Sequence, residues 1–255
     1  MSQSMSNAEK PAKKKSELRE TIVVIVEALV IALLFRTFLY QPFSIPTASM
    51  QSTLMIGDYF IASKFSWGYG KYAFPIALPF NGRFMVLAEP QRGEVAVFRN
   101  EITNEDYIKR IIGLPGDRIQ MQDGRLFING EMVEREEIGT GLDTDSEMRS
   151  VPVTVYRETL PNGVTHIIQE IADNGPLDDT AEYVVPAGHY FMMGDNRDRS
   201  QDSRVLSMVG YVPFDSFIGK AEARFFSITN NIPPWQLWEW PANVRWDRMF
   251  QSVHN

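Results

Sequence analysis

The sequence contains no cysteine and only three histidines among its 255 residues. The lack of cysteine excludes disulfides, thiolate metal sites and cysteine nucleophiles. The histidines, His166, His189 and His254, are not spaced as HExxH or as another metal-ligand motif, so a zinc enzyme is not indicated. Histidine-based serine catalysis stays open, because the members of a catalytic triad can lie far apart in sequence.

Basic residues are also few, with 25 Lys and Arg against 32 Asp and Glu and a formal net charge of −7. Phosphate binding requires a basic face, so no nucleic-acid partner is expected. The length suits one substantial domain with an insertion or a tail, and it is too short for several large domains. A membrane partner must therefore be argued from local sequence.

One long apolar run lies near the N-terminus. Residues Ile22 to Phe35 are almost wholly apolar, and the range 21–40 has the length of about twenty residues that a spanning helix needs. Lysines and arginines accumulate in residues 1–20, which the positive-inside rule places in the cytoplasm. No clear small-x-small cleavage site follows, so we expect an uncleaved transmembrane anchor over 21–40. Glu27 interrupts the run, and the sequence assigns it no purpose.

Beyond the anchor, short alternating or β-branched runs predict strands. They are Glu94–Arg99, Tyr107–Ile112, Arg125–Asn129, Tyr183–Met193 and Phe217–Ile228. Three dipeptides predict hairpin turns. They are Asp123-Gly124, Asn129-Gly130 and Asn162-Gly163. The pattern predicts an antiparallel, mostly β protein.

The predicted domain organisation follows from changes in composition along the chain. Residues 131–179 are more polar and acidic than their flanks, so we expect a smaller β subdomain inserted into a main β domain made of 41–130 and 180–229. The tail, 230–255, is rich in tryptophan, with Trp235, Trp238, Trp240 and Trp246. Such a tail suits a membrane interface, and core packing explains it almost as well.

Three segments carry residues with catalytic potential. Ser49 lies just beyond the anchor in FSIPTASMQSTL, and a serine hydroxyl becomes a good nucleophile only when a neighbouring base removes its proton. Lys109 interrupts the strand-like run YIKRIIGLPGD, where burial would lower its pKa and allow it to act as that base. The third segment, MGDNRDRSQDSR at 193–204, packs acids, arginines and serines together. Taken separately, Lys109 is better explained as a solvated strand residue and the third segment as a salt-bridged loop, and the three segments give only weak support to a serine hydrolase.

In combination and order, these segments resemble the signature segments of bacterial type I signal peptidases, also called leader peptidases. The matching stretches are IPTASMQSTL at 45–54, GDY at 57–59, RGEVAVFR at 92–99, YIKRIIGLPGD at 107–117 and GDNRDRSQDSR at 194–204. With the N-terminal anchor they span most of the chain and leave mainly the insertion and the tail unmatched.

The resemblance implies a membrane-bound serine endopeptidase that removes N-terminal signal peptides from exported preproteins. It would cut after small-x-small sites of the Ala-x-Ala kind. Ser49 would attack the scissile carbonyl, and Lys109 would act as the unprotonated general base of a Ser/Lys dyad. Thr47 matches the position whose hydroxyl joins the Ser49 N–H in stabilising the oxyanion, and such a donor is worth roughly 10² to 10³ in rate.

The same resemblance assigns supporting roles in the third segment. Ser200 matches a serine that orients the lysine amine, and Asp202 and Arg204 match residues that pair and support the site. Asp195 and Asn196 look structural. The chain departs from the common family pattern at three positions: Arg199 replaces an asparagine, Ser52 a proline and Glu94 an aspartate.

The resemblance also implies a place in the cell and a set of partners. The protein would be a single-pass protein of the bacterial inner (cytoplasmic) membrane, with a cytoplasmic N-terminus and a catalytic domain that is periplasmic or extracytoplasmic. Its partners would be signal peptides and membrane lipid. No cofactor and no metal ion are needed, because nucleophile, base and oxyanion donors are all protein groups.

Two other hypotheses are weighed against this one. A penicillin-binding or β-lactamase type enzyme also uses serine and lysine, but its SxxK signature is missing, since the residue three places after Ser49 is Ser52. A tethered β domain that only binds secreted proteins is compatible with the composition. It predicts that Ser49→Ala and Lys109→Ala are tolerated, whereas the peptidase hypothesis predicts near-complete loss of activity from either change.

Overall fold

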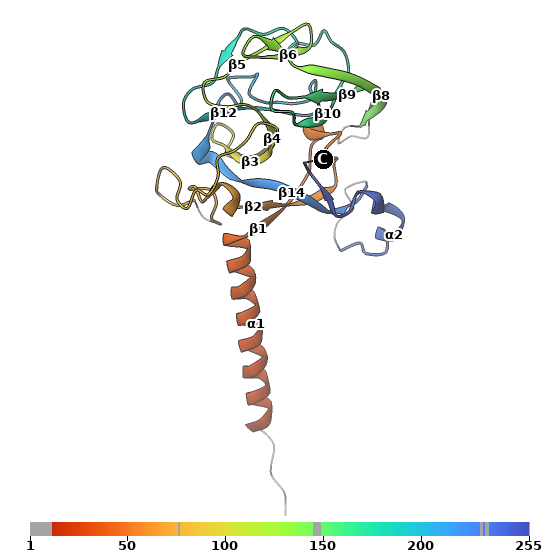
Figure 1. The fold of residues 1–255 in the computed structure, drawn as a ribbon. Helices are drawn as coiled ribbons and strands as arrows, with labels where there is room; N and C mark the ends of the chain where they lie inside the picture. The colour runs from red at the N-terminus through yellow and green to blue at the C-terminus, as the bar shows by residue number, and fades with distance from the viewer. Residues whose placement is uncertain (1–11, 76, 145–148, 230–231, 233–234, 255) are drawn as a thin grey trace, which may run out of the picture.

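A single long helix extends from a β-rich body in the computed structural model (Figure 1), which describes residues 12–75, 77–144, 149–229, 232 and 235–254. The helix, α1, spans Ala12–Phe38, and its stretch Glu17–Phe38 is long and apolar enough to cross a membrane. Most of its apolar side chains are exposed, whereas Phe38 at its C-terminal end packs on Tyr69 and Phe74 of the body. The helix ends two residues before the predicted limit of 40, because Tyr40 already pairs with Ser63 in the first strand.

The main sheet is antiparallel and has eight strands in the order β1-β2-β14-β3-β4-β12-β13, with β15 also paired to β14. These strands are β1 (Tyr40–Ser44), β2 (Asp58–Ser63), β3 (Val95–Asn100), β4 (Glu105–Gly113), β12 (His189–Met193), β13 (Val212–Pro213), β14 (Phe217–Ser227) and β15 (Gln251–Ser252). Only Leu39 separates α1 from β1. The sheet therefore begins directly at the end of the helix (Figure 1).

Two smaller antiparallel sheets lie on the side of the body remote from α1 (Figure 1). One has the order β11-β5-β6-β7, with β5 (Arg118–Gln122), β6 (Arg125–Ile128), β7 (Glu131–Met132) and β11 (Tyr183–Val184). The other has the order β10-β9-β8, with β8 (Glu134–Thr144), β9 (Ser150–Thr159) and β10 (Thr165–Glu170). The mostly β, antiparallel fold with one apolar N-terminal helix is thus confirmed.

The three predicted hairpin turns join paired strands. Asp123 and Gly124 link β5 to β6, and both have positive φ, +47° and +70°, as a two-residue hairpin turn requires. Asn129-Gly130 links β6 to β7, and Asn162-Gly163 lies in the turn between β9 and β10. Local turn chemistry was therefore sufficient to locate these connections.

The predicted strand Tyr183–Met193 is wrong as one element. It divides into β11, which pairs with β5, and β12, which pairs with β4 in the main sheet. The chain turns between them at Pro186–Gly188, where Gly188 has φ +70° and the His189 N–H donates to the Pro186 carbonyl. Proline and glycine disfavour a continuous strand, and the hydrophobic pattern alone does not register that break.

The predicted domain boundaries do not coincide with the boundaries of the three sheets. β5 and β6, which the sequence assigned to the main domain, lie in the four-stranded sheet with β11 and not in the eight-stranded sheet. The proposed insertion, 131–179, includes β7 and the whole β10-β9-β8 sheet. Parts of the N-terminal segment (1–11), of the insertion (145–148) and of the tail (230–231, 233–234 and 255) lie outside the described residues. The domain boundaries stay a prediction.

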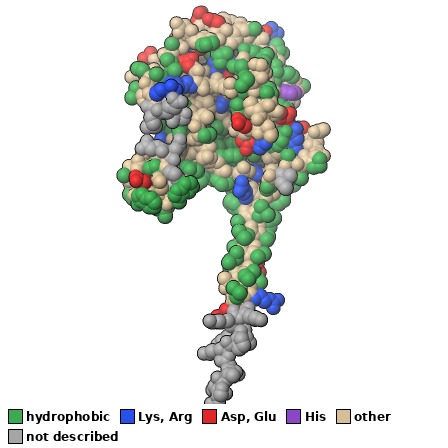
Figure 2. Space-filling model, turned by 180° about the vertical axis from the view of Figure 1, so that it is seen from behind, with side chains coloured by type: hydrophobic (Ala, Val, Ile, Leu, Met, Phe, Trp, Pro, Cys, Tyr) green, Lys and Arg blue, Asp and Glu red, His purple; other side chains and the backbone are tan. Residues whose placement is uncertain are grey.

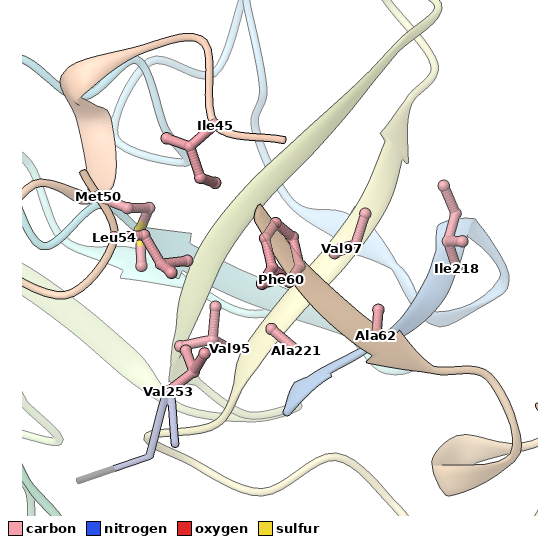
Figure 3. Packing of buried hydrophobic residues seen from close by; sticks show 10 residues of the cluster. All are labelled: Ile45, Met50, Leu54, Phe60, Ala62, Val95, Val97, Ile218, Ala221 and Val253. Carbon is pink, nitrogen blue, oxygen red and sulfur yellow. The ribbon is translucent and has the colours of Figure 1, made fainter. Parts of the chain in front are cut away.

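A buried apolar cluster fixes the segment between β1 and β2 onto the main sheet (Figure 3). Met50 and Leu54 are fully buried in this segment and pack with Phe60 of β2 and Val95 of β3. Burying a side chain of this size contributes about 2 kcal/mol. The short 3-10 helix η1 (Ala48–Met50) is therefore held rigidly at the sheet surface.

The C-terminal tail returns to the main sheet through a buried carboxylate. Asp58 of β2 is fully buried and accepts hydrogen bonds from Arg245 and Arg248 of the tail and from Ser227 of β14. Trp240 packs on Phe226 with ring centroids 4.9 Å apart. The remaining short helices are η2 (Phe65–Trp67), η3 (Phe214–Ser216), α2 (Trp240–Asn243) and η4 (Trp246–Arg248).

Candidate active site

The site forms where η1 meets the middle of β4. The Lys109 Nζ donates a hydrogen bond of 2.8 Å to the Ser49 Oγ, although the residues are 60 positions apart. Ser49 is 7% exposed and Lys109 is 4% exposed. The structure thus brings together the two residues that the sequence singled out as nucleophile and base, and it buries the lysine.

The burial of Lys109 follows from its place in the sheet. β4 starts exposed at Glu105 and becomes buried by Lys109, next to Arg110, where β12 joins β4 on the side opposite β3. The cross-strand partner of Lys109 is the small, fully buried Ala96, which leaves room for the long side chain. The amine also donates to the Ile108 carbonyl at 2.9 Å, so its direction is fixed by two acceptors.

Desolvation by burial lowers the pKa of Lys109 to about 8, and the charges of Asp202 and Asp195 offset part of this shift. Removal of water disfavours the charged ammonium, whereas nearby carboxylates favour it. With this pKa, roughly a tenth of the amines is uncharged at pH 7. A neutral amine that contacts a serine hydroxyl is able to accept the hydroxyl proton.

A cavity of about 270 Å³ opens in front of this pair. Its apolar lining includes Phe43, Pro46, Phe60, Val97 and Ile108. Polar and charged residues complete the lining: Thr47, Ser49, Glu105, Asp106, Lys109, Arg199 and Gln201. The reactive pair therefore faces a cavity whose lining is partly apolar and partly polar.

Thr47 stands at the mouth of the site. Its Oγ1 lies 3.4 Å from the Ser49 Oγ. Thr47 has an extended backbone and directly precedes η1, so its side chain and the Ser49 N–H belong to the same short segment. The position is compatible with a donor to an atom bound at Ser49.

The loop 194–204 packs closely behind the pair. A Cβ added to Gly194 would lie 2.4 Å from the Ser49 carbonyl oxygen and 2.2 Å from the Ser200 Oγ. Only glycine allows this approach. Ser200 is buried, and its Oγ has no hydrogen-bond partner among the described residues. The two described hydrogen bonds of the Lys109 amine go to Ser49 and Ile108, so the orienting role predicted for Ser200 stays a prediction.

Asp202 and Arg204 form the buried pair that the sequence expected. The Arg204 Nε and Nη2 each donate to one carboxylate oxygen of Asp202 at 2.9 Å, and the Gly194 N–H donates to the same carboxylate at 3.0 Å. Burial by itself would raise the pKa of Asp202, but Arg204 and these hydrogen bonds lower it. Asp202 is therefore a fixed negative charge whose field reaches Lys109.

A second buried ion pair, which the sequence interpretation missed, lies behind β4. Arg110 binds Asp195 through two hydrogen bonds, at 2.8 and 2.7 Å, and Thr53 also donates to that carboxylate. Successive strand residues point to opposite faces, so Lys109 faces the site while Arg110 faces the loop. The pair connects residues 85 positions apart, and no local pattern in the sequence reveals such a contact.

The three departures from the family pattern each have a partner in the structure. Ser52 has φ +91° and donates to the Ile167 carbonyl at 2.9 Å, and proline is unable to adopt this φ. Glu94 pairs with Lys220 at 2.7 Å. Arg199 pairs with Asp143, which comes from β8 of the predicted insertion.

The site offers serine, lysine and backbone N–H groups, and the described residues contain no group of three or more His, Asp or Glu side chains placed to hold a metal ion.

Three of the tail tryptophans are exposed, with Trp235 at 74%, Trp238 at 72% and Trp246 at 67%. Trp240 packs on the sheet instead. Packing thus explains Trp240, and the interfacial role of the three exposed tryptophans stays a prediction.

Comparison with known proteins gives consistent findings. Residues 18–226 match the family model described as signal peptidase, peptidase S26. The chain is 39% identical over 247 residues to a protein named Signal peptidase I from Rickettsia typhi, covering 88% of this chain and 90% of the relative. A protein of the same name from Rickettsia akari is 39% identical over 248 residues, covering 88% and 89%.

A crystal structure of a signal peptidase I from Enterococcus faecalis V583 is also similar in sequence. The identity is 28%, and the alignment covers 52% of this chain and 97% of that chain, with a TM-score of 0.32.

Proposed function

The chain belongs to the signal peptidase family, peptidase S26, and from this premise we propose that it removes signal peptides with a Ser49/Lys109 dyad. As a member of this family it is a serine endopeptidase. The observation that carries the residue assignment is the 2.8 Å contact between the Lys109 amine and the Ser49 hydroxyl in a buried setting.

In the proposed reaction, the neutral Lys109 amine removes the Ser49 hydroxyl proton as the Oγ attacks the scissile carbonyl carbon. The carbonyl oxygen becomes an oxyanion, which the Ser49 N–H and the Thr47 hydroxyl stabilise. The resulting Lys109 ammonium then protonates the leaving amine, which releases the mature protein and leaves the signal peptide as an ester on Ser49. Lys109 next activates a water molecule that hydrolyses this ester.

The cavity supports a preference for small side chains before the cut. Its volume of about 270 Å³ has to hold several residues of an extended substrate, and rings such as Phe43 and Phe60 line it. Small pockets exclude bulky side chains by steric overlap. We therefore assign small-x-small specificity to this cavity.

An extended substrate has a sheet edge available beside the dyad. β4 pairs with β12 only over Arg110–Gly113, so in the described part of the chain the stretch Glu105–Lys109 has a strand partner, β3, on one side only. The Ile108 carbonyl is directed toward the site, since it accepts from the Lys109 amine. Peptides commonly bind such edges by strand addition.

The proposed membrane topology rests on α1 and on the tail. The exposed apolar surface of α1 runs along its length, and a second apolar lobe projects on the same side of the body (Figure 2). The C-terminal tail, with exposed Trp235, Leu237 and Trp238, extends toward that side. We place α1 across the inner membrane with a cytoplasmic N-terminus, and the tail tryptophans at the lipid interface.

The test is cleavage of a purified preprotein in detergent, with the cut position read by mass spectrometry. Wild type is expected to cut after a small-x-small site, whereas Ser49→Ala and Lys109→Ala are expected to be inactive. Lys220→Ala is the matched control, because Lys220 is a partly exposed lysine of β14 that pairs with Glu94. Undiminished cutting by folded Ser49→Ala or Lys109→Ala would refute the dyad and favour another nucleophile.

A further inference from the structure

Asn196 holds the two carbonyl groups on either side of the Ser49 Cα. Its side-chain Nδ2 donates to the Ala48 carbonyl oxygen at 3.1 Å, and its backbone N–H donates to the Ser49 carbonyl oxygen at 3.2 Å. Asn196 is fully buried, so both hydrogen bonds are shielded from water. The backbone around the nucleophile is thus fixed from the loop 194–204.

The Ala48 carbonyl accepts hydrogen bonds from the Asn196 Nδ2 and from the Gln51 N–H, the latter at 3.0 Å, and together they fix the direction of the Ser49 N–H. Ala48 C=O and Ser49 N–H belong to one peptide unit, and in a planar trans peptide these two groups point in opposite directions. A hydrogen bond that holds the carbonyl therefore aims the N–H away from Asn196. This N–H is the backbone donor of the proposed oxyanion site, and an acceptor bond on the far end of the same peptide polarises it.

Asp143 in turn fixes the Asn196 amide. The same Nδ2 that donates to Ala48 donates its other hydrogen to the Asp143 Oδ1 at 3.0 Å. Asp143 is 0% exposed. An amide group with both hydrogens committed has one orientation available, so the Asp143 carboxylate decides where the bond to Ala48 points.

Two further contacts suit Asp143 to this position. Arg199 pairs with its second oxygen, Oδ2, which neutralises a charge that would otherwise repel an oxyanion nearby. Gln51 lies two residues after the nucleophile. In the orientation of its side-chain amide that satisfies all neighbouring groups, the nitrogen donates to the Asp143 Oδ1 at 3.1 Å and to the Thr144 carbonyl at 3.2 Å. The end of β8 thus contacts the nucleophile segment in two ways, through Asn196 and through Gln51.

We propose that Asp143, in the predicted inserted subdomain, is a positioning residue that orients the oxyanion-binding peptide Ala48–Ser49 through Asn196. The inference rests on the proposed function, because it concerns the donor that the Ser49 nucleophile uses. It gives the acidic insertion a task in the reaction: one buried carboxylate at the end of β8 reaches the nucleophile backbone through a single side chain.

The first test compares Asp143→Asn with wild type in full-length, detergent-solubilised protein. Loss of an oxyanion donor costs about 10² to 10³ in rate, and a donor that is loosened and not removed is expected to cost about tenfold in kcat. KM should change little, since the ground state does not use the donor fully. A peptide aldehyde, which forms a tetrahedral adduct, should lose affinity by a similar factor, whereas an uncleavable peptide should bind as before.

The matched control is Glu137→Gln, which removes an exposed carboxylate from the same strand and should leave both kinetic constants unchanged. The second test adds Asp143→Asn to Asn196→Ala. If Asp143 acts through Asn196, the double variant is no slower than Asn196→Ala alone, whereas independent roles give losses that multiply. If Asp143→Asn does not fold, Asn196→Ala alone still tests the proposal. The proposal requires that this variant have a lower kcat at an unchanged KM.

Three results would overturn the proposal: a raised KM at constant kcat, unchanged aldehyde affinity, or multiplying losses. Each is distinguishable from failure of the proposed function. If Ser49→Ala still cuts, the dyad itself is wrong, whatever Asp143 does. If Ser49→Ala is inactive and Asp143→Asn is fully active, only the positioning role is wrong.

Discussion

Replacing Lys109 with methionine is expected to stabilise the folded protein at neutral pH while abolishing peptidase activity. Burial lowers the pKa of Lys109 from 10.5 to about 8 in the folded state. Between these two values the unfolded chain binds more protons at this position than the folded chain, so the stability of wild type rises with pH across this window. At pH 7 the buried amine is mostly charged and costs free energy that methionine does not.

The magnitude follows from the size of the shift. One pKa unit corresponds to about 1.4 kcal/mol, so a pKa lowered to about 8 from 10.5 costs the wild-type fold about 3 kcal/mol at pH 7. The cost falls to about 1 kcal/mol at pH 10 by the same relation. Methionine has a similar volume, and such a swap in a packed site is well tolerated.

The assay is denaturant unfolding of the full-length protein in detergent micelles at pH 7 and pH 10, for wild type and Lys109→Met. The control is Lys220→Met, at a partly exposed lysine paired with Glu94, which is expected to give no gain at pH 7. An equal stability difference at the two pH values for Lys109→Met would refute the argument, because it would show that desolvation does not depress the pKa of this amine.

Three further outcomes are expected. In a pH series, kcat/KM should rise about tenfold per unit up to the lowered pKa of Lys109, about 8, and then level off, because only the neutral amine acts as base; a flat profile from pH 6 to 9 would contradict this. Gly194→Ala should lose activity in the cleavage assay while remaining folded, since its Cβ would clash with the Ser49 carbonyl. Arg110→Ala should lower the unfolding free energy by about 3 to 5 kcal/mol in denaturant titrations, because Asp195 would be left buried and charged; a loss under 1 kcal/mol would show that water reaches the carboxylate.

Local signals in the sequence were enough to predict much of the fold. Turn dipeptides containing Gly124 and Gly130 mark hairpins, and short apolar, β-branched runs mark β3 and β4. The apolar run predicts α1, although the helix begins nine residues before the predicted span of 21–40 and ends two residues before its limit. Sheet membership was not predictable in this way, because β11 and β12 share one hydrophobic run and differ only in which distant strand they pair with.

In the candidate site, too, some residues were predictable from the sequence and others were not. Ser49 and Lys109 were identified because the segments around them resemble a known family, and the structure adds their contact and the burial of Lys109. Asp143 was not identified, since it lies in a polar, acidic stretch in which one buried carboxylate looks like its exposed neighbours. Burial of a charge depends on the partners that the fold supplies, here Asn196 and Arg199, and these lie more than fifty positions away.

The single residue between α1 and β1 has a consequence for where a substrate is cut. Ser49 follows the last helical residue, Phe38, by eleven positions, so the two are at most about 38 Å apart even along an extended chain. The Tyr69 hydroxyl also donates to the Phe38 carbonyl at 2.6 Å, which ties the helix end to the body. On the proposed topology, the cutting height above the lipid is set by this rigid joint. An Ala-x-Ala sequence far along an exported chain would then not be cut, because it is not held at this distance from the membrane. Lengthening the connection between α1 and β1 should change which sites are cut.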